Sequence, residues 1–239
     1  MLGDLDVELA ADVAMTIGPR ARALELDVTS PESFEEFVAA CGPLDVLVNN
    51  AGIMPEGRFL EEQDSTTRAI LDVNVVGPIN GMRAALPGMV GRGRGHVVNV
   101  ASMLGKIELP GLASYVASKH AVVGLSAAVR SELAGTGVTL TTVLPAVVNT
   151  ELSSGITIPL ARFLKVEPED VAQAIVASVE RPRHEVSVPR WAAWYPKLRA
   201  LFPAALDARL RRTVGDDKAL TAVDPAVRAA YTKRIARRS

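Results

Sequence analysis

The chain has 239 residues, of which 49% are hydrophobic and 22% are charged, and its formal net charge at pH 7 is −1. This composition excludes a disordered chain and provides enough apolar material for the core of one large α/β domain or of two small ones. The single cysteine, Cys41, excludes an internal disulfide framework, and because there is neither an apolar run near the roughly 20 residues of a membrane span nor a signal-peptide pattern, we expect a cytoplasmic protein.

Strand-like and helix-like segments alternate along the chain. Residues 1–4 have the pattern of the end of a β-strand and run directly into a helical repeat. Continuous Val- and Leu-rich runs predict strands covered on both faces, at 23–28, 44–50, 96–102, 138–145 and 184–189. Helical patterns occupy 7–17, 33–40, 66–89, 114–133 and 169–179. This alternation predicts an α/β fold with a doubly wound parallel sheet and right-handed crossovers.

One helical pattern carries a candidate catalytic pair. Tyr115 and Lys119 are four residues apart, so their side chains lie on the same face of the helix predicted over 114–133. With three tyrosines and six lysines in the chain, this spacing alone is weak evidence. Neighbouring motifs decide whether the pair is meaningful. Ser102 ends a predicted strand, Asn74 lies inside a predicted helix, and two other strands end in LVNNAG (47–52) and LPAVVNT (144–150).

Taken together, these motifs resemble the classical branch of the short-chain dehydrogenase/reductase family, from Asp4 to about Thr150 and more weakly to residue 189. The resemblance implies a Rossmann-like catalytic domain over 1–189, with helices on both faces of the sheet, followed by a basic helical extension over 190–239. It also implies an NAD(P)-dependent oxidoreductase that interconverts an alcohol and a ketone or aldehyde, and a homo-oligomer, dimer or tetramer.

The chemistry of the side chains agrees with that resemblance. A free phenol has a pKa of about 10, but a nearby ammonium stabilises the phenolate and lowers this value. Beside Lys119, Tyr115 would therefore exchange a proton with the substrate while hydride moves to or from nicotinamide. Ser102, at the carboxyl end of a strand, would hydrogen-bond the substrate oxygen.

Asn74 has a separate expectation, because Pro78 follows it by four residues. A proline ring clashes with the carbonyl four positions back and offers it no N–H, so the main-chain carbonyl of Asn74 should be freed and the helix distorted. The resemblance implies that this carbonyl holds a water that links to Lys119 and passes protons to solvent. A kinked helix packed in a subunit interface is the alternative interpretation.

The choice of cofactor depends on Asp4. An acid at the end of the second strand accepts hydrogen bonds from a ribose 2′-OH and repels a 2′-phosphate, so NAD is favoured over NADP. Asp6 competes for this role, and either acid could instead stabilise a helix N-terminus. The other cofactor contacts that the resemblance implies are Asp27 and Val28 at the adenine, Asn50, Ala51 and Gly52 beneath the adenosine ribose, Val148 and Thr150 at the carboxamide, Lys119 at the nicotinamide ribose, and Tyr115.

The position of Asp4 leads to an expectation about the start of the sequence. If Asp4 ends the second strand of the family, the sequence begins inside that strand, and we expect an N-terminally truncated fold without the first strand and helix. The glycine-rich turn that cradles the pyrophosphate would then be absent, and 23–28 would have no pairing partner beside 44–50. The alternative is a genuine short form, a cofactor-less remnant that acts as a binding or regulatory module.

Two segments should frame the substrate, 103–112 after Ser102 and 151–164 after Thr150. The second occupies the place of the family's mobile lid. Its apolar residues predict a hydrophobic alcohol or ketone of steroid, retinoid or lipid type. These residues are Ile156, Ile158, Leu160, Phe163 and Leu164.

The C-terminal extension is basic, with twelve Lys/Arg and four Asp/Glu from Arg190 to Ser239, and it is rich in aromatic residues near its start. It could form an amphipathic helix on a membrane surface, an arm that closes the pocket or a subunit interface, or helices packed on the body with a solvated basic face. Nucleic-acid binding is not expected, since no recognition motif occurs. The three histidines are spaced for no metal site.

Overall fold

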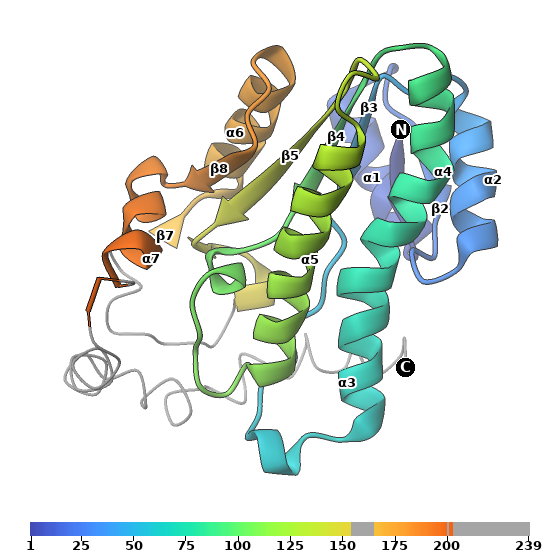
Figure 1. Ribbon diagram of the computed structural model, residues 1–239. Coiled ribbons are helices and arrows are strands. Elements are labelled where there is room, and N and C mark those ends of the chain that lie inside the picture. The colour runs from blue at the N-terminus through green and yellow to red at the C-terminus, as the bar shows by residue number, and fades with distance from the viewer. Residues whose placement is uncertain (154–164, 200, 203–239) are drawn as a thin grey trace.

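A computed structural model describes residues 1–153, 165–199 and 201–202. The fold is a parallel α/β sheet with helices on both faces, as predicted: α2, α4 and α5 cover one face, and α1 and α6 the other (Figure 1). The helices are α1 (Val7–Ile17), α2 (Pro31–Cys41), α3 (Asp64–Leu71), α4 (Gly77–Gly91), α5 (Ala113–Glu132), α6 (Pro168–Glu180) and α7 (Trp194–Arg199). Short 3-10 turns are η1 (Phe59–Glu61), η3 (Met103–Gly105), η4 (Glu151–Ser153) and η6 (Arg190–Ala193).

The strands form three parallel groups. The largest has the order β3-β4-β5-β8, and the pairs β1-β2 and β6-β7 are separate. Their bounds are β1 (Leu2–Asp4), β2 (Ala23–Glu25), β3 (Val46–Asn49), β4 (Gly95–Val100), β5 (Val138–Pro145), β6 (Val147–Val148), β7 (Lys165–Val166) and β8 (Glu185–Val188). The central strands β4 and β5 are almost fully buried, which explains why their sequences show no polar alternation.

The sequence signals at the helix starts have the expected physical role. The Ser30 side chain accepts a hydrogen bond from the Ser33 N–H, and Pro31 occupies the first turn. The helix α2 therefore begins directly after Ser30. Asp6 caps α1 in the same way by accepting from the Leu9 N–H at 3.1 Å. Satisfied N-terminal N–H groups therefore set both boundaries.

The sheet is interrupted between β1 and β3. The prediction that 23–28 lacks a pairing partner was wrong in one respect, because β2 pairs with β1 in the register Leu2↔Ala23. Within the described residues, however, β1 pairs only with β2, and β3 pairs only with β4. The interruption therefore lies one strand further in than expected, where apolar residues of both strands, including Leu2 and Leu47, line a cavity.

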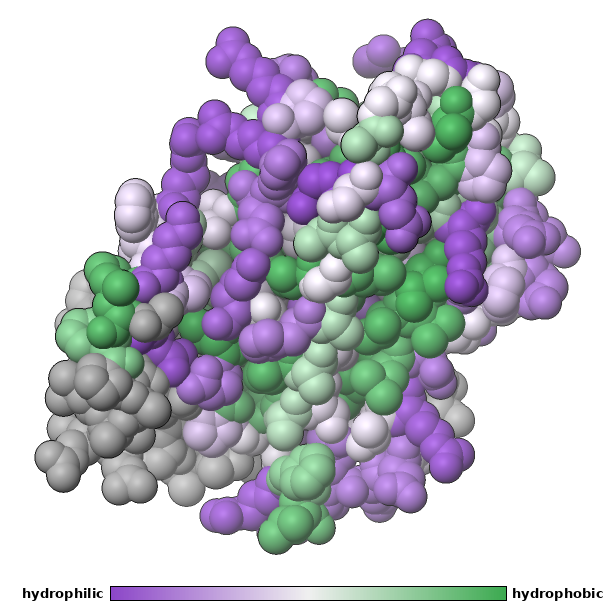
Figure 2. Space-filling view, in the orientation of Figure 1, coloured by the Kyte–Doolittle hydropathy of each residue, from purple (hydrophilic) through white to green (hydrophobic). Residues whose placement is uncertain are grey.

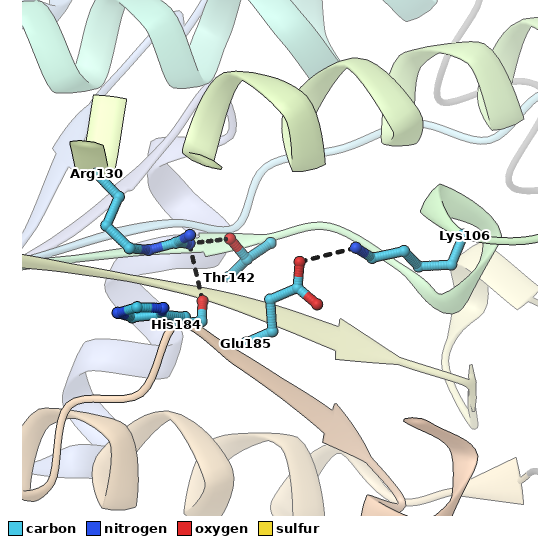
Figure 3. Close-up of polar contacts among 5 residues, drawn as sticks. All are labelled: Lys106, Arg130, Thr142, His184 and Glu185. Carbon is cyan, nitrogen blue, oxygen red and sulfur yellow. Dashed lines mark hydrogen bonds and ion pairs between the residues drawn. The ribbon is translucent and has the colours of Figure 1, made fainter. Parts of the chain in front are cut away.

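Arg130 joins three elements at the opposite end of the sheet from this interruption. From α5 its guanidinium donates to Thr142 Oγ1 at 3.0 Å and to the His184 carbonyl oxygen at 2.8 Å (Figure 3). It also donates to the Leu140 carbonyl oxygen at 3.0 Å. Nearby, Lys106 Nζ pairs with Glu185 at 2.8 Å. The loop after β4 is thereby attached to β8, and the end of α5 to the residue just before it.

None of the helices in the described part of the chain is long and apolar enough to cross a bilayer.

Candidate active site

Tyr115 and Lys119 lie together near the start of α5, and both are 5% exposed. The Lys119 Nζ is 5.6 Å from the centre of the Tyr115 ring and donates to the Val100 carbonyl at 3.2 Å. Burial lowers the pKa of Lys119 from 10.5 to about 8, because desolvation disfavours the ammonium. The group still carries its proton at neutral pH, so a positive charge lies beside the phenol ring.

Ser102 follows β4, at the carboxyl edge of the sheet. Its hydroxyl oxygen accepts a hydrogen bond from the Leu104 N–H at 3.1 Å and thereby caps η3. The side chain is nearly buried and lines the same cavity as Tyr115 and Lys119. The hydroxyl hydrogen can therefore be directed into this cavity toward a polar atom of a ligand.

The helix is distorted at Asn74, where Pro78 predicts it. Residues Asp72–Val76 form a π-helical turn between α3 and α4, and the Gly77 N–H reaches back to the Asp72 carbonyl. The predicted single helix over 66–89 is therefore three segments. Because Pro78 has no N–H, the Asn74 carbonyl has no bonding partner four residues on. Single π-turns of this kind often occur at functional sites.

The side chain of Asn74 has a further role that the sequence did not predict. Its Oδ1 accepts from the Ile53 N–H at 2.8 Å, and its Nδ2 donates to the Ile53 carbonyl at 2.9 Å and to Ser118 Oγ at 3.0 Å. The loop after β3 is thereby tied to α5, at the position between Tyr115 and Lys119 on the chain. We call these contacts the Asn74 clamp. Asn74 is 1% exposed, and a buried amide needs hydrogen-bond partners, so an asparagine buried in a helix indicates a clamp of this kind.

Gly52 lies in the loop that Asn74 holds. A Cβ atom at this position would stand 3.3 Å from Asn74 Oδ1 and 3.5 Å from Lys119 Nζ. The absence of a side chain thus lets the main chain pass close to the lysine. Asn50, Ala51 and Gly52 all line the cavity at this point.

A single cavity of about 1400 Å³ joins the predicted site residues. It extends from the interruption between β1 and β3, past α5, to the segment that begins with η6. Asn74 does not line it, because its amide is bonded to Ile53. The other predicted site residues all do: Asp4, Asp27, Val28, Asn50, Ala51, Gly52, Ser102, Tyr115, Lys119, Val148 and Thr150.

The acids near the N-terminus have distinct positions. Asp4 is the last residue of β1, lines the cavity and accepts a hydrogen bond from the Asp6 N–H at 2.9 Å. Asp6 caps α1, so the role of stabilising the helix N-terminus, which was considered for both acids, belongs to Asp6. Asp27 accepts hydrogen bonds from the N–H and hydroxyl of Thr29. Of the two candidates, Asp4 is the one at the cavity.

The far end of the cavity is apolar. Tyr115 packs there with Met54, Leu109 and Leu112, in a cluster that Leu104 and Leu152 extend. Trp191 and Tyr195 line the cavity from the C-terminal side. The predicted lid residues Ile156, Ile158, Leu160, Phe163 and Leu164 lie outside the described residues.

Comparisons with known proteins show the family to which the chain belongs. The family model described as short chain dehydrogenase matches residues 4–159. The chain belongs to this family. Among curated relatives, it is 35% identical over 187 residues to an uncharacterized oxidoreductase of Staphylococcus saprophyticus, covering 75% of this chain and 79% of that protein. It is 32% identical to dehydrogenase/reductase SDR family member 7B of Xenopus laevis, covering 74% of this chain and 59% of that protein.

A solved structure is similar as well. A short chain dehydrogenase from Burkholderia cenocepacia, in complex with NADP, is 33% identical with a TM-score of 0.71, covering 81% of this chain and 80% of that one. The family match over residues 4–159 runs from Asp4, the last residue of β1, past β6, and includes every predicted site residue.

Proposed function

We propose that the protein interconverts an alcohol and a ketone or aldehyde with a nicotinamide dinucleotide. The observation that carries this proposal is the burial of Tyr115 and Lys119 side by side, on the wall of a cavity that Ser102 also lines. A protonated Lys119 favours the phenolate form of Tyr115. The pair is thus suited to general acid–base catalysis near neutral pH.

Each side chain has one role in this mechanism. In oxidation Tyr115 takes the hydroxyl proton of the alcohol, and in reduction it returns a proton to the carbonyl oxygen. Ser102 hydrogen-bonds the same oxygen and orients it. The main-chain carbonyl of Asn74 would hold a water that connects Lys119 to solvent. Nicotinamide, when bound, supplies or accepts the hydride.

The residues that line the two ends of the cavity support the binding of a dinucleotide. Asp4, Asp27 and Val28 line the end suited to adenosine, and Val148 and Thr150 line the end near Tyr115 that is suited to nicotinamide. Asn50, Ala51 and Gly52 lie between them. Within the described residues, no glycine-rich turn at a helix N-terminus lines this middle part. The described residues therefore lack the main-chain N–H groups with which such a turn would bind the pyrophosphate.

The acid at the end of β1 supports NAD as the cofactor, because a carboxylate repels a 2′-phosphate. The NADP in the Burkholderia relative argues the other way. The Asp4→Asn variant distinguishes these cases, since it keeps an acceptor for the Asp6 N–H and removes the charge. We expect the wild type to bind NADH more tightly than NADPH, and the variant to lose this preference. Equal affinities in the wild type would contradict the choice of NAD.

The apolar end of the cavity supports a hydrophobic substrate of steroid, retinoid or lipid type. Met54, Leu109 and Leu112 pack with Tyr115, so this part of the cavity wall offers hydrocarbon contacts to a substrate. A panel of secondary alcohols of increasing hydrophobicity, assayed by the absorbance of reduced nicotinamide, should show rising kcat/KM.

The Tyr115→Phe variant tests the mechanism. It removes only the phenol oxygen, so dinucleotide affinity should change little while turnover falls by about 100-fold to 10,000-fold. If Tyr115→Phe retained its turnover, Tyr115 would be ruled out as the acid–base group.

A second candidate function is a binding or regulatory module without a cofactor, which the interruption between β1 and β3 favours. Titration of the wild type with NADH and NADPH separates the two functions. Binding of either supports the oxidoreductase, and binding of neither supports the module.

A further inference from the structure

Exposed apolar side chains follow one side of the segment after β8. Four of them, in η6 and α7, recur at helical spacing, and two more follow the end of α7. Each exposes between 39% and 79% of its surface, and Figure 2 shows hydrophobic residues gathered over α7 at the left of the view. We call this set the aromatic stripe: Trp191, Trp194, Tyr195, Leu198, Leu201 and Phe202.

The other side of the segment is firmly attached. Ala192 is 1% exposed and packs with Ala101 and Met103, next to Ser102. Arg199 donates two hydrogen bonds to the carboxylate of Glu108, at 2.7 and 3.2 Å, and so joins α7 to the loop after β4. The exposure of the stripe is therefore a property of a packed element, not of a frayed end.

The segment that carries the stripe is itself positively charged. No acidic residue occurs from Pro189 to Phe202. Arg190 adjoins the stripe, and Lys197 Nζ lies 5.2 Å from the centre of the Trp194 ring. Arg199 is already neutralised by Glu108. Aromatic rings with cations beside them suit the interface of a membrane that carries anionic headgroups.

The stripe also reaches the cavity. Trp191 and Tyr195 belong to both, because each is partly exposed and each lines the apolar end of the cavity. The stripe therefore adjoins the wall of the cavity that Tyr115 also lines.

We propose that the aromatic stripe is a docking surface for a membrane with anionic headgroups, from which an apolar substrate enters the cavity. The entry of substrate rests on the proposed function, whereas the docking itself does not. A second copy of the chain fits less well, because a two-fold contact through this stripe would bring Arg190 and Lys197 of both copies, four cations, into one interface.

Intrinsic fluorescence reads this surface directly, since Trp191 and Trp194 are the two tryptophans of the chain. The full chain is mixed with vesicles of phosphatidylcholine, with or without phosphatidylserine. We expect a blue shift of the emission with the anionic vesicles, weakened by added salt, and co-sedimentation under the same conditions. Absence of both with anionic vesicles overturns the proposal.

The matched variants carry equal charge changes on two exposed apolar pairs. Trp194→Glu with Leu198→Glu alters the stripe outside the cavity wall, and Phe59→Glu with Leu60→Glu alters η1, whose side chains are 67% and 95% exposed. We expect the first pair to weaken vesicle binding by about tenfold or more and the second to leave it unchanged.

Two further outcomes distinguish the interpretations. Equal effects of both pairs, or a lower oligomeric mass with the first pair alone, overturn membrane docking, and the latter indicates an interface between copies. Dinucleotide binding is measured in the same samples. A chain that binds vesicles but neither NADH nor NADPH contradicts the proposed function and still supports the docking surface.

Discussion

The side-chain nitrogen of Lys119 donates a hydrogen bond to the main-chain oxygen of Val100, at 3.2 Å. This contact joins α5 to the end of β4, in a region where Lys119 is 5% exposed. One carbonyl compensates only part of the hydration that a buried ammonium loses, which is why its pKa falls to about 8.

The buried ammonium predicts a pH dependence of stability. Between pH 8 and 10.5 the folded Lys119 is largely neutral while the unfolded one still binds its proton, so the free energy of unfolding rises with pH in this window. The expected gain is about 3 kcal/mol relative to the Lys119→Met variant. Urea unfolding of both proteins at several pH values measures it. The same pH dependence in both would show that Lys119 is not the group responsible.

The Asn74 clamp predicts a stability loss that depends on the two donors of its amide. Asn74→Asp keeps the acceptor for the Ile53 N–H but places a carboxylate against the Ile53 carbonyl and Ser118. We expect a loss of about 2–4 kcal/mol by chemical denaturation. Asn149→Ala is the control, because the Asn149 side chain is exposed and bonds only weakly to Glu167. A similarly small loss in both variants would mean that the clamp does not stabilise the fold.

Two helical glycines predict opposite effects of the same substitution. In Gly81→Ala the new Cβ would lie 2.8 Å from Phe34 and closer still to the Asn49 amide oxygen, so a loss of about 1–3 kcal/mol is expected. Gly124 on α5 is exposed and has open space, so Gly124→Ala should gain about 0.5–1 kcal/mol. Thermal unfolding followed by circular dichroism compares them. Stabilisation by both would show that α4 can move away from β3.

The guanidinium of Arg130 predicts a difference between two replacements. Arg130→Lys retains the charge but loses the planar arrangement that reaches Leu140, Thr142 and His184 together. Arg130→Met loses both, and we expect a cost of about 2–4 kcal/mol for Met and a smaller cost for Lys. Urea unfolding ranks the variants, and equal stability of Arg130→Met and the wild type would contradict the prediction.

Much of the fold follows from local patterns. The expected helix over 7–17 matches α1, because Asp6 and Gly18 cap a repeat whose period is unambiguous. The strands at 96–102 and 138–145 are continuous apolar runs and lie at the centre of the sheet. Local periodicity and capping suffice where a segment's own residues determine its boundaries.

Other features depend on residues far apart in the sequence. Pro78 predicts a distortion at Asn74, but the contacts of the Asn74 amide with Ile53 and Ser118 need the tertiary fold. The pairing of 23–28 was assigned from the strand order of a complete sheet, whereas β2 pairs with the short β1. The choice between Asp4 and Asp6 likewise needed the position of the helix cap. Spacing alone cannot supply such long-range partners.

The interruption of the sheet should make α1 open more readily than the central strands β4 and β5. Residues of α1 contact β1 and β2, and Val13, Met15 and Ile17 expose 45%, 71% and 63% of their surfaces. Little apolar burial therefore opposes local unfolding of this helix. Amide hydrogens of 7–17 should exchange with deuterium well before those of β4 and β5, in a step of low free energy. A peptide segment that pairs with the edges of both β1 and β3 would slow that exchange, so its binding could be detected as slower deuterium uptake in residues 7–17.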